Sequence, residues 1–510
     1  VGGNFLLNST GELVLSGSRS HLDSIGFNVS GNVEANGTII GSGFGSMITM
    51  NGTGKQLKAS SAIGTGIRIA QGADISLAGN VEMSNGNIFI VAGKLSTGNF
   101  ELNLNENYFV IPGGEFTSSG NVYAGITGIC SGNGNTNMSS ILAYCSMDGP
   151  AGKIILNDAI MNVNSGRFLI GEILGAQVSN GEMILSNFSE VNFSNNTLIE
   201  VTPNSYLEFD IESAFKGAAS FSNNGYMVIG SSSGIRQTGN AGNIQVANRT
   251  FHNGPSTTYE YRSEESQSTG GGLPSELFGT VIFNHTGEDG IVLTNPLVIK
   301  EGGTLNLADG ILHVSGFSTL TLEHNANFLG GGPGNFINGG LTKIGTANFT
   351  FHVGRDNLYS PVIINEVSGG LATDKYRVEY FPTKATNQFF GIIDQDEVTH
   401  ISSMDTWLIE KLEGDLNSRK SVVVSYNERS GVNDLSSLIA VYKDGDFYRK
   451  QNNYSINGTT SSGTITFMPA LYGPFTLGST NAMMNPLPVN LVNFTAEKFG
   501  LTAALKWTIT

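Results

Sequence analysis

Two glutamates and a tyrosine occupy matching places in a repeated motif, and they are the side chains best placed for chemistry. Glu82 and Glu101 each lie two positions after a Gly-Asn dipeptide, and Tyr123 has the same place in the next copy. If each copy forms one strand of a stacked coil, these side chains point outward in one row of one sheet. Paired carboxylates can bind Ca²⁺ through hard oxygen ligands or act as acid and base on a sugar.

The alternative is that both carboxylates are ordinary solvated surface charges, and the aromatic residue in the third copy favours this interpretation. We therefore treat Glu82, Glu101 and Tyr123 as candidate contacts for carbohydrate or Ca²⁺. The sequence contains no recognisable catalytic constellation and no spacing typical of a metal site. Apart from Ca²⁺, no cofactor is expected.

The two cysteines, Cys130 and Cys145, flank a polar loop. In an oxidising compartment, a disulfide bond between them closes a loop of about 15 residues and stabilises the fold by roughly 3 kcal/mol. The alternative is a pair of free thiols in a loop. We predict that the two cysteines are bridged in the exported protein.

The Gly-Asn motif recurs at about the length of one coil of a β-solenoid, and an alternating strand follows each copy. Gly and Asn accept the positive φ of a tight corner. We expect Val81, Phe100 and Val122 to point inward, because they hold the same place in three consecutive copies. A coil this short must stack on its neighbours to bury its apolar side chains, which predicts a right-handed parallel β-helix. The alternative is hairpin turns in an antiparallel sandwich. The copies begin at Gly31-Asn32, Gly79-Asn80, Gly98-Asn99, Gly120-Asn121 and, more loosely, Gly242-Asn243.

The composition indicates an elongated all-β protein. Gly contributes 68 of 510 residues and charged residues only 13%, whereas helix-forming residues are scarce. The formal charge of −16 repels phosphate backbones, so nucleic acid is not an expected partner. No apolar run approaches the roughly 18 residues of a membrane-spanning helix. Together these properties predict an exported protein without a membrane span.

Changes in composition and in strand length along the chain predict four parts. Residues 1–262 form the parallel β-helix, 263–345 contain a linker or excursion followed by further solenoid strands, and 346–480 form an antiparallel β-sandwich that caps the solenoid. Residues 481–510 form a linker and the start of an immunoglobulin-like or fibronectin-like module, whose pattern stops midway and predicts that the protein continues.

Two short segments have compositions that depart from the strand pattern. Ser263–Gly272 is polar and rich in Gly, which predicts the linker or excursion at the start of the second part. Ser213–Ser220 is the only stretch in the first part that suits a helical turn, although Gly217 limits it.

Several motifs in the second half resemble large surface proteins that bacteria export by the type IX secretion system. They are Val298–Gly316, Phe336–Lys343, Phe349–Gly354 and Tyr359–Val362 at the junction of repeats and sandwich, then Gly473–Ser479, Leu487–Leu491 and Leu505–Thr508. The family usually has Pro where this chain has His352. The resemblance implies a β-solenoid, a β-sandwich and a module that precedes a C-terminal sorting domain. It also implies contact with the type IX export machinery and a secreted, cell-surface or outer-membrane-associated location, and it transfers no catalytic residues.

Three functions fit this sequence. The first is a non-enzymatic, adhesin-like or structural surface protein whose rigid solenoid meets glycans or other cell-surface components. The second is a polysaccharide lyase or glycoside hydrolase built on a β-helix, and the third is a phage or fibre spike. Acidic residues, Arg and aromatic residues gathered in one groove would favour the enzyme over the adhesin.

Overall fold

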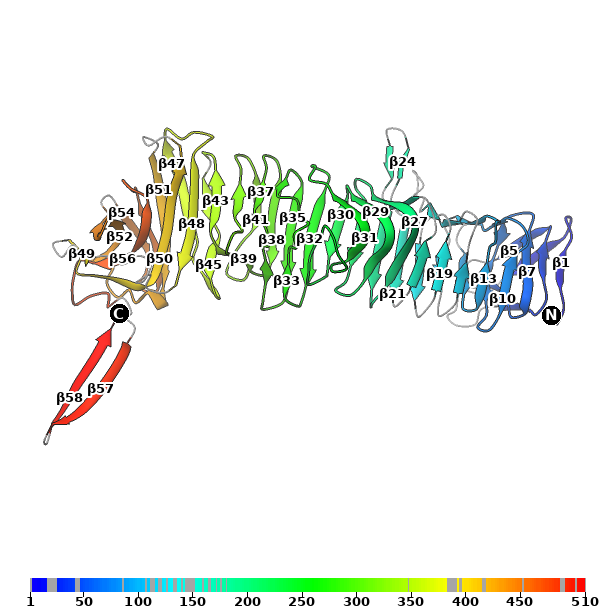
Figure 1. Cartoon of the computed structure of the whole chain (residues 1–510), viewed down its shortest axis with the longest axis horizontal. Coiled ribbons are helices and arrows are strands. Elements are labelled where there is room, and N and C mark those ends of the chain that lie inside the picture. Colours follow the sequence, from blue (N-terminus) through cyan, green and yellow to red (C-terminus); the bar gives the residue numbers. More distant parts are fainter. Residues whose placement is uncertain are drawn as a thin grey trace. The chain divides into compact units, whose positions relative to one another are not determined.

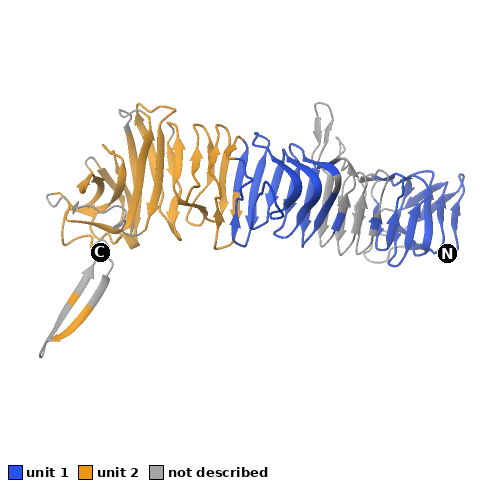
Figure 2. Ribbon diagram, in the orientation of Figure 1, with its two compact units in different colours: residues 1–274, 279–282 blue, residues 275–278, 283–510 orange. Residues whose placement is uncertain are grey.

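The structure is a computed structural model of the chain, and it divides into two compact units (Figure 2). Unit 1 comprises residues 1–274 and 279–282, and unit 2 comprises 275–278 and 283–510. The described residues are 2–15, 25–41, 46–84, 87–105, 108–110, 115–117, 122–124, 127–131, 135–138, 141–142, 152–157, 160–163, 167–170, 172–174, 177–179, 181–346, 348–382, 392–393, 397–414, 419–451, 454–486, 491–499 and 502–509.

The described residues of unit 1 form a parallel β-solenoid of about 11 turns, in which strands stack in three rows (Figure 1). The parallel β-helix predicted from the sequence is therefore confirmed. The first row contains β1 (Phe5–Leu7), β4 (Val33–Ala35), β7 (Thr53–Ala59), β10 (Asp74–Leu77), β13 (Lys94–Ser96), β16 (Glu115–Thr117), β19 (Asn135–Met138) and β22 (Ile160–Val163).

The second row contains β2 (Glu12–Leu15), β5 (Thr38–Gly41), β8 (Ile63–Gly64), β11 (Val81–Glu82), β14 (Leu102–Asn105), β17 (Val122–Ala124), β20 (Ile141–Leu142) and β23 (Arg167–Ile170). Three long strands, β27 (Glu190–Val201), β29 (Ala214–Asn223) and β31 (Ile244–Phe251), continue the first and second rows together.

The third row contains β3 (Ile25–Val29), β6 (Ser46–Met50), β9 (Gly66–Ile69), β12 (Ile88–Val91), β15 (Tyr108–Val110), β18 (Thr127–Ser131), β21 (Gly152–Asn157), β26 (Gly181–Ser186), β28 (Tyr206–Phe209), β30 (Tyr226–Ile229) and β32 (Thr258–Ser263). The short antiparallel pair β24 (Glu172–Leu174) and β25 (Gln177–Ser179) and the two-residue strand β33 (Gln267–Ser268) complete unit 1.

Alternation of inward apolar and outward polar side chains builds much of the core of unit 1. In β4, Val33 and Ala35 are buried while Glu34 between them reaches solvent. Apolar side chains of successive coils then stack, as Val33 does in register with Leu57. The stacking lets a coil too short to enclose its own core bury apolar area against its neighbours.

Five phenylalanines form a cluster in this core. Phe215 is fully buried, and its ring centroid lies 4.9 Å from that of Phe209, 5.2 Å from Phe193, 6.3 Å from Phe221 and 6.4 Å from Phe168. The rings meet edge to face, the arrangement that aromatic quadrupoles favour.

The expected register is wrong for one copy of the Gly-Asn motif. Val81 pairs with Leu102, and Leu102 pairs with Val122, so Leu102 takes the inward place that was assigned to Phe100. Phe100 instead lies in a turn after Gly98, whose φ is +54°, and 39% of it is exposed. The turn is two residues longer than the shared motif implies, and it shifts this copy by two positions.

The Gly-Asn corners contribute contacts between coils as well as unusual backbone angles, since φ is positive at Gly98 and Gly242. Gly31 has an ordinary φ, but a Cβ there would lie 2.5 Å from the backbone of Gly3 in the preceding coil. The Asn side chains at the corners accept hydrogen bonds from backbone N–H groups of the next coil. Asn32 N donates to Asn4 Oδ1 (2.9 Å), Gln56 N donates to Asn32 Oδ1 (3.0 Å) and Glu101 N donates to Asn80 Oδ1 (3.0 Å).

Two local predictions are corrected. Ser213–Ser220 does not form a helical turn, because Ala214–Asn223 is the long strand β29, with Phe215 and Phe221 in the core. Ser263–Gly272 is not an open linker. Gln267 within it is buried, and its Nε2 donates to the carbonyls of Ile229 (2.8 Å) and Ser231 (3.1 Å).

Unit 2 begins with further parallel coils. Their strands are β34 (Glu276–Leu277), β37 (Leu297–Ile299), β40 (Leu320–Leu322) and β43 (Leu341–Ile344) in one row, β36 (Ile291–Val292), β39 (Leu312–Val314), β42 (Ile337–Gly339) and β45 (Val353–Arg355) in a second, and β38 (Thr304–Asp309) and β41 (Asn327–Gly330) in a third. β45 pairs with β46 (Leu358–Tyr359), and β35 (Thr280–His285) crosses the division between the units in sequence.

Antiparallel sheets follow the coils in unit 2, as expected for a β-sandwich. One sheet runs from β43 through β48 (Lys375–Phe381), β50 (His400–Glu413), β56 (Gly473–Ser479), β52 (Leu438–Asp444) and β53 (Phe447–Lys450) to β49 (Ile392–Ile393). The other contains β44 (Phe349–Phe351), β47 (Val362–Ser368), β51 (Arg419–Asn427), β55 (Ser462–Phe467) and β54 (Tyr454–Gly458). Phe467 and Phe475 join the two sheets, with ring centroids 5.0 Å apart.

Two smaller elements complete unit 2. A 3₁₀ turn, Glu428–Ser430, follows β51, and its N-cap residue Asn427 accepts the N–H of Arg429. β57 (Leu491–Phe499) and β58 (Thr502–Ile509) form an antiparallel pair.

The strand β43 joins the parallel coils to the sandwich. It pairs in parallel with β40 on one side and antiparallel with β48 on the other. Lys343 of β43 is 7% exposed, and its Nζ donates to the carbonyls of Glu323 (2.5 Å) and Ile344 (2.9 Å) and lies 5.7 Å from the ring centroid of Phe349. Burial lowers the pKa of Lys343 to about 8.

We predict that Phe215→Ala lowers the free energy of unfolding of unit 1 by about 3–5 kcal/mol, because it empties the centre of the phenylalanine stack. Phe100→Ala is the matched control, and its exposed ring should contribute less than about 1 kcal/mol. Denaturant unfolding of both variants measures the difference. Equal losses would contradict the register described here.

We also predict a pH dependence that originates at Lys343. Its folded-state pKa lies below the ordinary 10.5, so the unfolded chain binds more protons between about pH 8 and 10.5. The free energy of unfolding should therefore rise with pH across this window, by about 2–3 kcal/mol relative to Lys343→Met. Denaturant unfolding at several pH values measures this, and parallel curves for the two proteins would refute the assignment.

Candidate functional site

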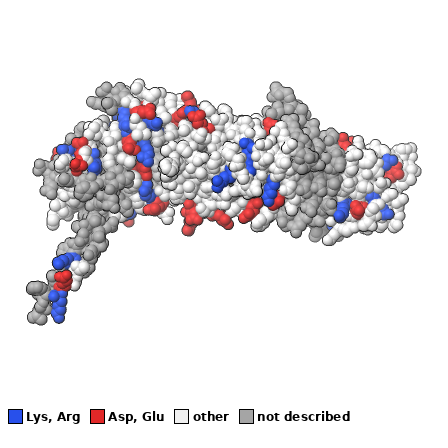
Figure 3. All heavy atoms as spheres, viewed as in Figure 1, with Lys and Arg blue, Asp and Glu red and all other residues white. Residues whose placement is uncertain are grey.

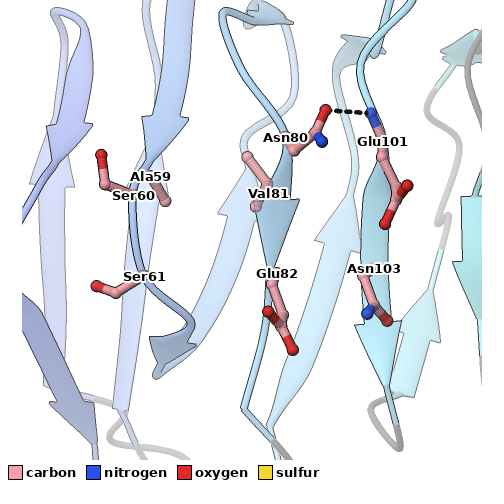
Figure 4. A pocket seen from close by; sticks show the side chains of 8 residues that line it. All are labelled: Ala59, Ser60, Ser61, Asn80, Val81, Glu82, Glu101 and Asn103. Atoms are coloured by element: carbon pink, nitrogen blue, oxygen red, sulfur yellow. Dashed lines mark hydrogen bonds between the residues drawn. The ribbon is translucent and has the colours of Figure 1, made fainter.

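The two glutamates chosen from the sequence line one hollow on the outside of unit 1, with a volume of about 250 Å³ (Figure 4). It lies across β7, β11 and β14 and the corners that precede and follow them. Its lining consists of amide, hydroxyl and carboxylate groups with two apolar residues, and none of the lining residues is basic. The lining residues are Ala59, Ser60, Ser61, Asn80, Val81, Glu82, Glu101 and Asn103.

The solenoid register sets the positions of the four polar residues between neighbouring coils. Glu82 pairs with Asn103, whereas Asn80 lies beside Glu101 and accepts a 3.0 Å hydrogen bond from its backbone N–H. The two carboxylates therefore lie on a diagonal, each beside an amide, and not side by side as predicted. Figure 4 shows this arrangement, with Glu101 next to Asn80 and Glu82 next to Asn103.

The third predicted contact, Tyr123, belongs to the same row as Glu82. The register pairs Asn103 with Tyr123, so the row reads Glu82, Asn103, Tyr123 across β11, β14 and β17. The side-chain position of Tyr123 lies outside the described residues. The structure thus brings Glu82 and Glu101 to one hollow and places the strand of Tyr123 on the next coil.

The hollow presents hydrogen-bond acceptors in excess of donors. Ser60 and Ser61 already donate their hydroxyls, to Asn36 Oδ1 (2.7 Å) and to the carbonyl of Gly37 (2.9 Å). Carboxylate and amide oxygens suit the hydroxyls of a sugar and are also the ligand type that Ca²⁺ prefers. Ca²⁺ at this place stays a prediction.

The disulfide prediction is not decided by the structure. Cys130 belongs to β18, but its side chain lies outside the described residues, as does all of Cys145. The bridge between them therefore stays a prediction.

A second polar group, which the sequence analysis missed, lies on the third row of unit 1. The phenol of Tyr206 donates to Glu208, and the phenol of Tyr226 donates to Glu260. Arg262 joins the two carboxylates, through Nε to Glu260 Oε1 at 2.8 Å and through Nη1 to Glu208 Oε1 at 3.1 Å. We call these five residues the tyrosine–glutamate cluster.

Burial differs sharply within the tyrosine–glutamate cluster. The side chain of Glu260 is only 4% exposed, that of Glu208 is 26% exposed and that of Arg262 is 41% exposed. The rings of Tyr206 and Tyr226 lie 5.1 Å apart. Burial, followed by the hydrogen bonds to the carboxylates, raises the pKa of both tyrosines, so each stays a neutral phenol that donates to its carboxylate.

Sequence spacing gives only a weak signal for this cluster. Tyr206 and Glu208 alternate on one strand, as do Glu260 and Arg262, which places each pair on one face. However, Arg262 and Glu208 are 54 residues apart, and only the stacking of β28, β30 and β32 brings them together.

The described part of unit 1 therefore belongs to the class of parallel β-solenoids with polar outward rows. Comparisons of the chain with protein families, with curated proteins and with solved structures found no match. Within the described ranges, no helix is long and apolar enough to cross a membrane, and no three His, Cys, Asp or Glu residues are grouped so as to hold a metal ion.

We predict that Arg262→Met lowers the free energy of unfolding of unit 1 by about 3 kcal/mol, because it leaves the buried Glu260 carboxylate without its cation. Lys58→Met is the matched control. Lys58 pairs with Glu34 at 3.0 Å, but both side chains are more than 40% exposed, so the loss should be much smaller than that of Arg262→Met. Chemical denaturation measures both, and a loss at Arg262 no larger than at Lys58 would contradict the prediction.

Proposed function

We propose that the chain is a non-enzymatic, adhesin-like protein that presents its β-solenoid to glycans or other cell-surface components. The observation that carries this proposal is the hollow around Glu82, Asn103 and Glu101, because it offers amide, carboxylate and hydroxyl groups and no basic residue. Such groups bind sugar hydroxyls through hydrogen bonds, each of which contributes little in water.

The regular spacing of the rows supports binding to a polymer. Neighbouring coils repeat every 4.7–4.9 Å or so, which gives outward side chains a fixed spacing along the solenoid. Several weak contacts on one chain, or many copies of the protein on one surface, then raise the avidity without strong individual sites. Among the described residues on the face seen in Figure 3, most are uncharged, which suits neutral polysaccharides.

Some charged residues on the described outward rows face one another. Glu190 pairs with Lys216, and Lys300 lies 2.6 Å from Glu323 and 3.3 Å from Glu276. These pairs link neighbouring coils and leave their charges largely compensated. This arrangement suggests that these charged residues stabilise the stacking of the coils and do not take part in catalysis.

A cell-surface location reached through type IX secretion forms part of this proposal. Its support is the sequence resemblance around Val298–Gly316, Phe349–Gly354 and Leu487–Leu491. The solenoid followed by antiparallel sheets agrees with the architecture that the resemblance implies.

A polysaccharide lyase or hydrolase is the second candidate function, and the tyrosine–glutamate cluster favours it. Two carboxylates, an arginine and two tyrosines share one sheet face, which is the combination expected of a carbohydrate-active site on a β-helix. Against this, hydrogen bonds tie each carboxylate to a phenol and to Arg262.

We predict that the purified chain binds neutral polysaccharides weakly and releases no product. The test incubates it with neutral and acidic polysaccharides, with and without Ca²⁺, and follows retention together with new reducing ends and unsaturated products. Glu101→Gln should weaken retention roughly tenfold if this carboxylate accepts a sugar hydroxyl. Glu190→Gln, outside the hollow, is the control and should retain binding.

The same experiment separates the two candidates. Product formation that Glu208→Gln abolishes would replace the adhesin with an enzyme whose site is the tyrosine–glutamate cluster. If the chain binds none of these polysaccharides and releases no product from them, glycans are ruled out as its partner. A Ca²⁺ requirement lost in Glu82→Gln would confirm the predicted Ca²⁺ contact.

A further inference from the structure

A lysine and two carboxylates meet inside the sandwich of unit 2. Lys420 Nζ lies 3.2 Å from Glu366 Oε2 and 3.6 Å from Asp374 Oδ2. The side chain of Lys420 is 2% exposed, that of Asp374 is fully buried and that of Glu366 is 25% exposed. Lys and Asp side chains are seldom fully buried in proteins, and here a second carboxyl group also lies beside the amine. We call Lys420, Asp374 and Glu366 the trio.

The three residues come from both sheets of the sandwich. Glu366 in β47 and Lys420 in β51 are cross-strand neighbours in the five-stranded sheet. Asp374 directly precedes β48, which belongs to the sheet that continues from β43. A bond between Lys420 and Asp374 would therefore connect one sheet to the other.

The surroundings hold the trio closely. A Cβ at Gly414 would lie 1.9 Å from Asp374 Oδ1, so only glycine allows the chain to pass there. Gly370 N donates to Glu366 Oε1 at 2.5 Å, and the ring centroid of Tyr376 lies 5.9 Å from Lys420 Nζ. Fixed groups at this distance react more readily than free ones, because the entropy of bringing them together is already lost.

A reaction between Lys420 and Asp374 needs one proton to pass from the ammonium to the aspartate. Transfer of one proton from the ammonium to the aspartate converts a buried ion pair into a neutral amine and a neutral carboxylic acid. The neutral amine is a nucleophile, and the neutral acid is an electrophile. Glu366 is the nearer carboxylate and contacts the amine, so it can carry the proton.

We propose that Lys420 and Asp374 become joined by an intramolecular amide bond, with Glu366 as the proton carrier. Lys420 Nζ attacks Asp374 Cγ and forms the C–N bond, and Glu366 accepts the proton that the nitrogen loses. Glu366 then returns this proton to the departing hydroxyl, so the C–O bond breaks and one water leaves. The reaction is a condensation, and it needs no oxidant, reductant or cofactor.

The positions of the carboxylates favour Asp374 over Glu366 as the bonded partner. Asp374 is the fully buried carboxyl group, and its Oδ2 accepts the N–H of Leu371 at 3.3 Å, which draws electron density from the carboxyl carbon. Glu366 retains contact with solvent, through which protons exchange.

The test is the intact mass of the purified chain, followed by peptide mapping. The proposal expects a mass lower than that of the sequence by one water, and a branched peptide in which Lys420 is linked to Asp374. Lys420→Arg and Asp374→Ala should each restore the full mass. Lys375→Arg is the matched control, since Lys375 pairs with Glu413 at 3.2 Å at the surface, and it should keep the deficit.

Each other outcome would overturn the proposal or one of its assignments. A full intact mass with an unmodified Lys420 peptide would overturn it, whatever the variants do. A branch between Lys420 and Glu366 would overturn the assignment to Asp374. Complete formation of the bond in Glu366→Gln would overturn the role of Glu366, whereas a mass deficit that survives Lys420→Arg would assign the lost water to another site.

Discussion

The stacking distance between coils is the constraint on which the rest of unit 1 depends. Backbone hydrogen bonds between parallel strands fix it at roughly 4.8 Å, so each outward side chain has a neighbour directly above and below. This explains why Gly31 lies where a Cβ would meet the preceding coil, and why Asn32 can bond the backbone of the next coil. It also explains how opposite charges such as Glu34 and Lys58 can pair between neighbouring coils.

Much of this fold can be predicted from the sequence, because alternation of apolar and polar residues depends only on the pleat of a strand. The register between coils cannot be predicted in the same way, since it depends on the length of each turn. Phe100 shows the difference. Its Gly-Asn motif is intact, but a turn at Gly98 with a φ of +54° shifts it by two residues, and Leu102 takes the inward place. The strand at Ala214–Asn223 likewise follows from stacking and not from local propensity.

The candidate sites also differ in how far the sequence predicts them. Glu82 and Glu101 were found from sequence because they belong to adjacent coils, although their diagonal arrangement was not. The tyrosine–glutamate cluster draws Glu208 and Arg262 from strands two coils apart, and the trio in the sandwich draws Lys420 from the opposite sheet to Asp374. Such groupings arise from tertiary pairing, for which no local spacing rule exists.

The pairing of the strand β43 affects how readily the protein can aggregate with other molecules. A parallel sheet that ends in an unpaired strand exposes a row of N–H and C=O groups that can template the addition of a strand from another molecule. In unit 2 the row β34, β37, β40 and β43 does not end in this way, because β48 pairs with β43 in the opposite direction. The change of strand direction thus removes one growth point for edge-to-edge aggregation, in a chain whose repeats would otherwise favour it.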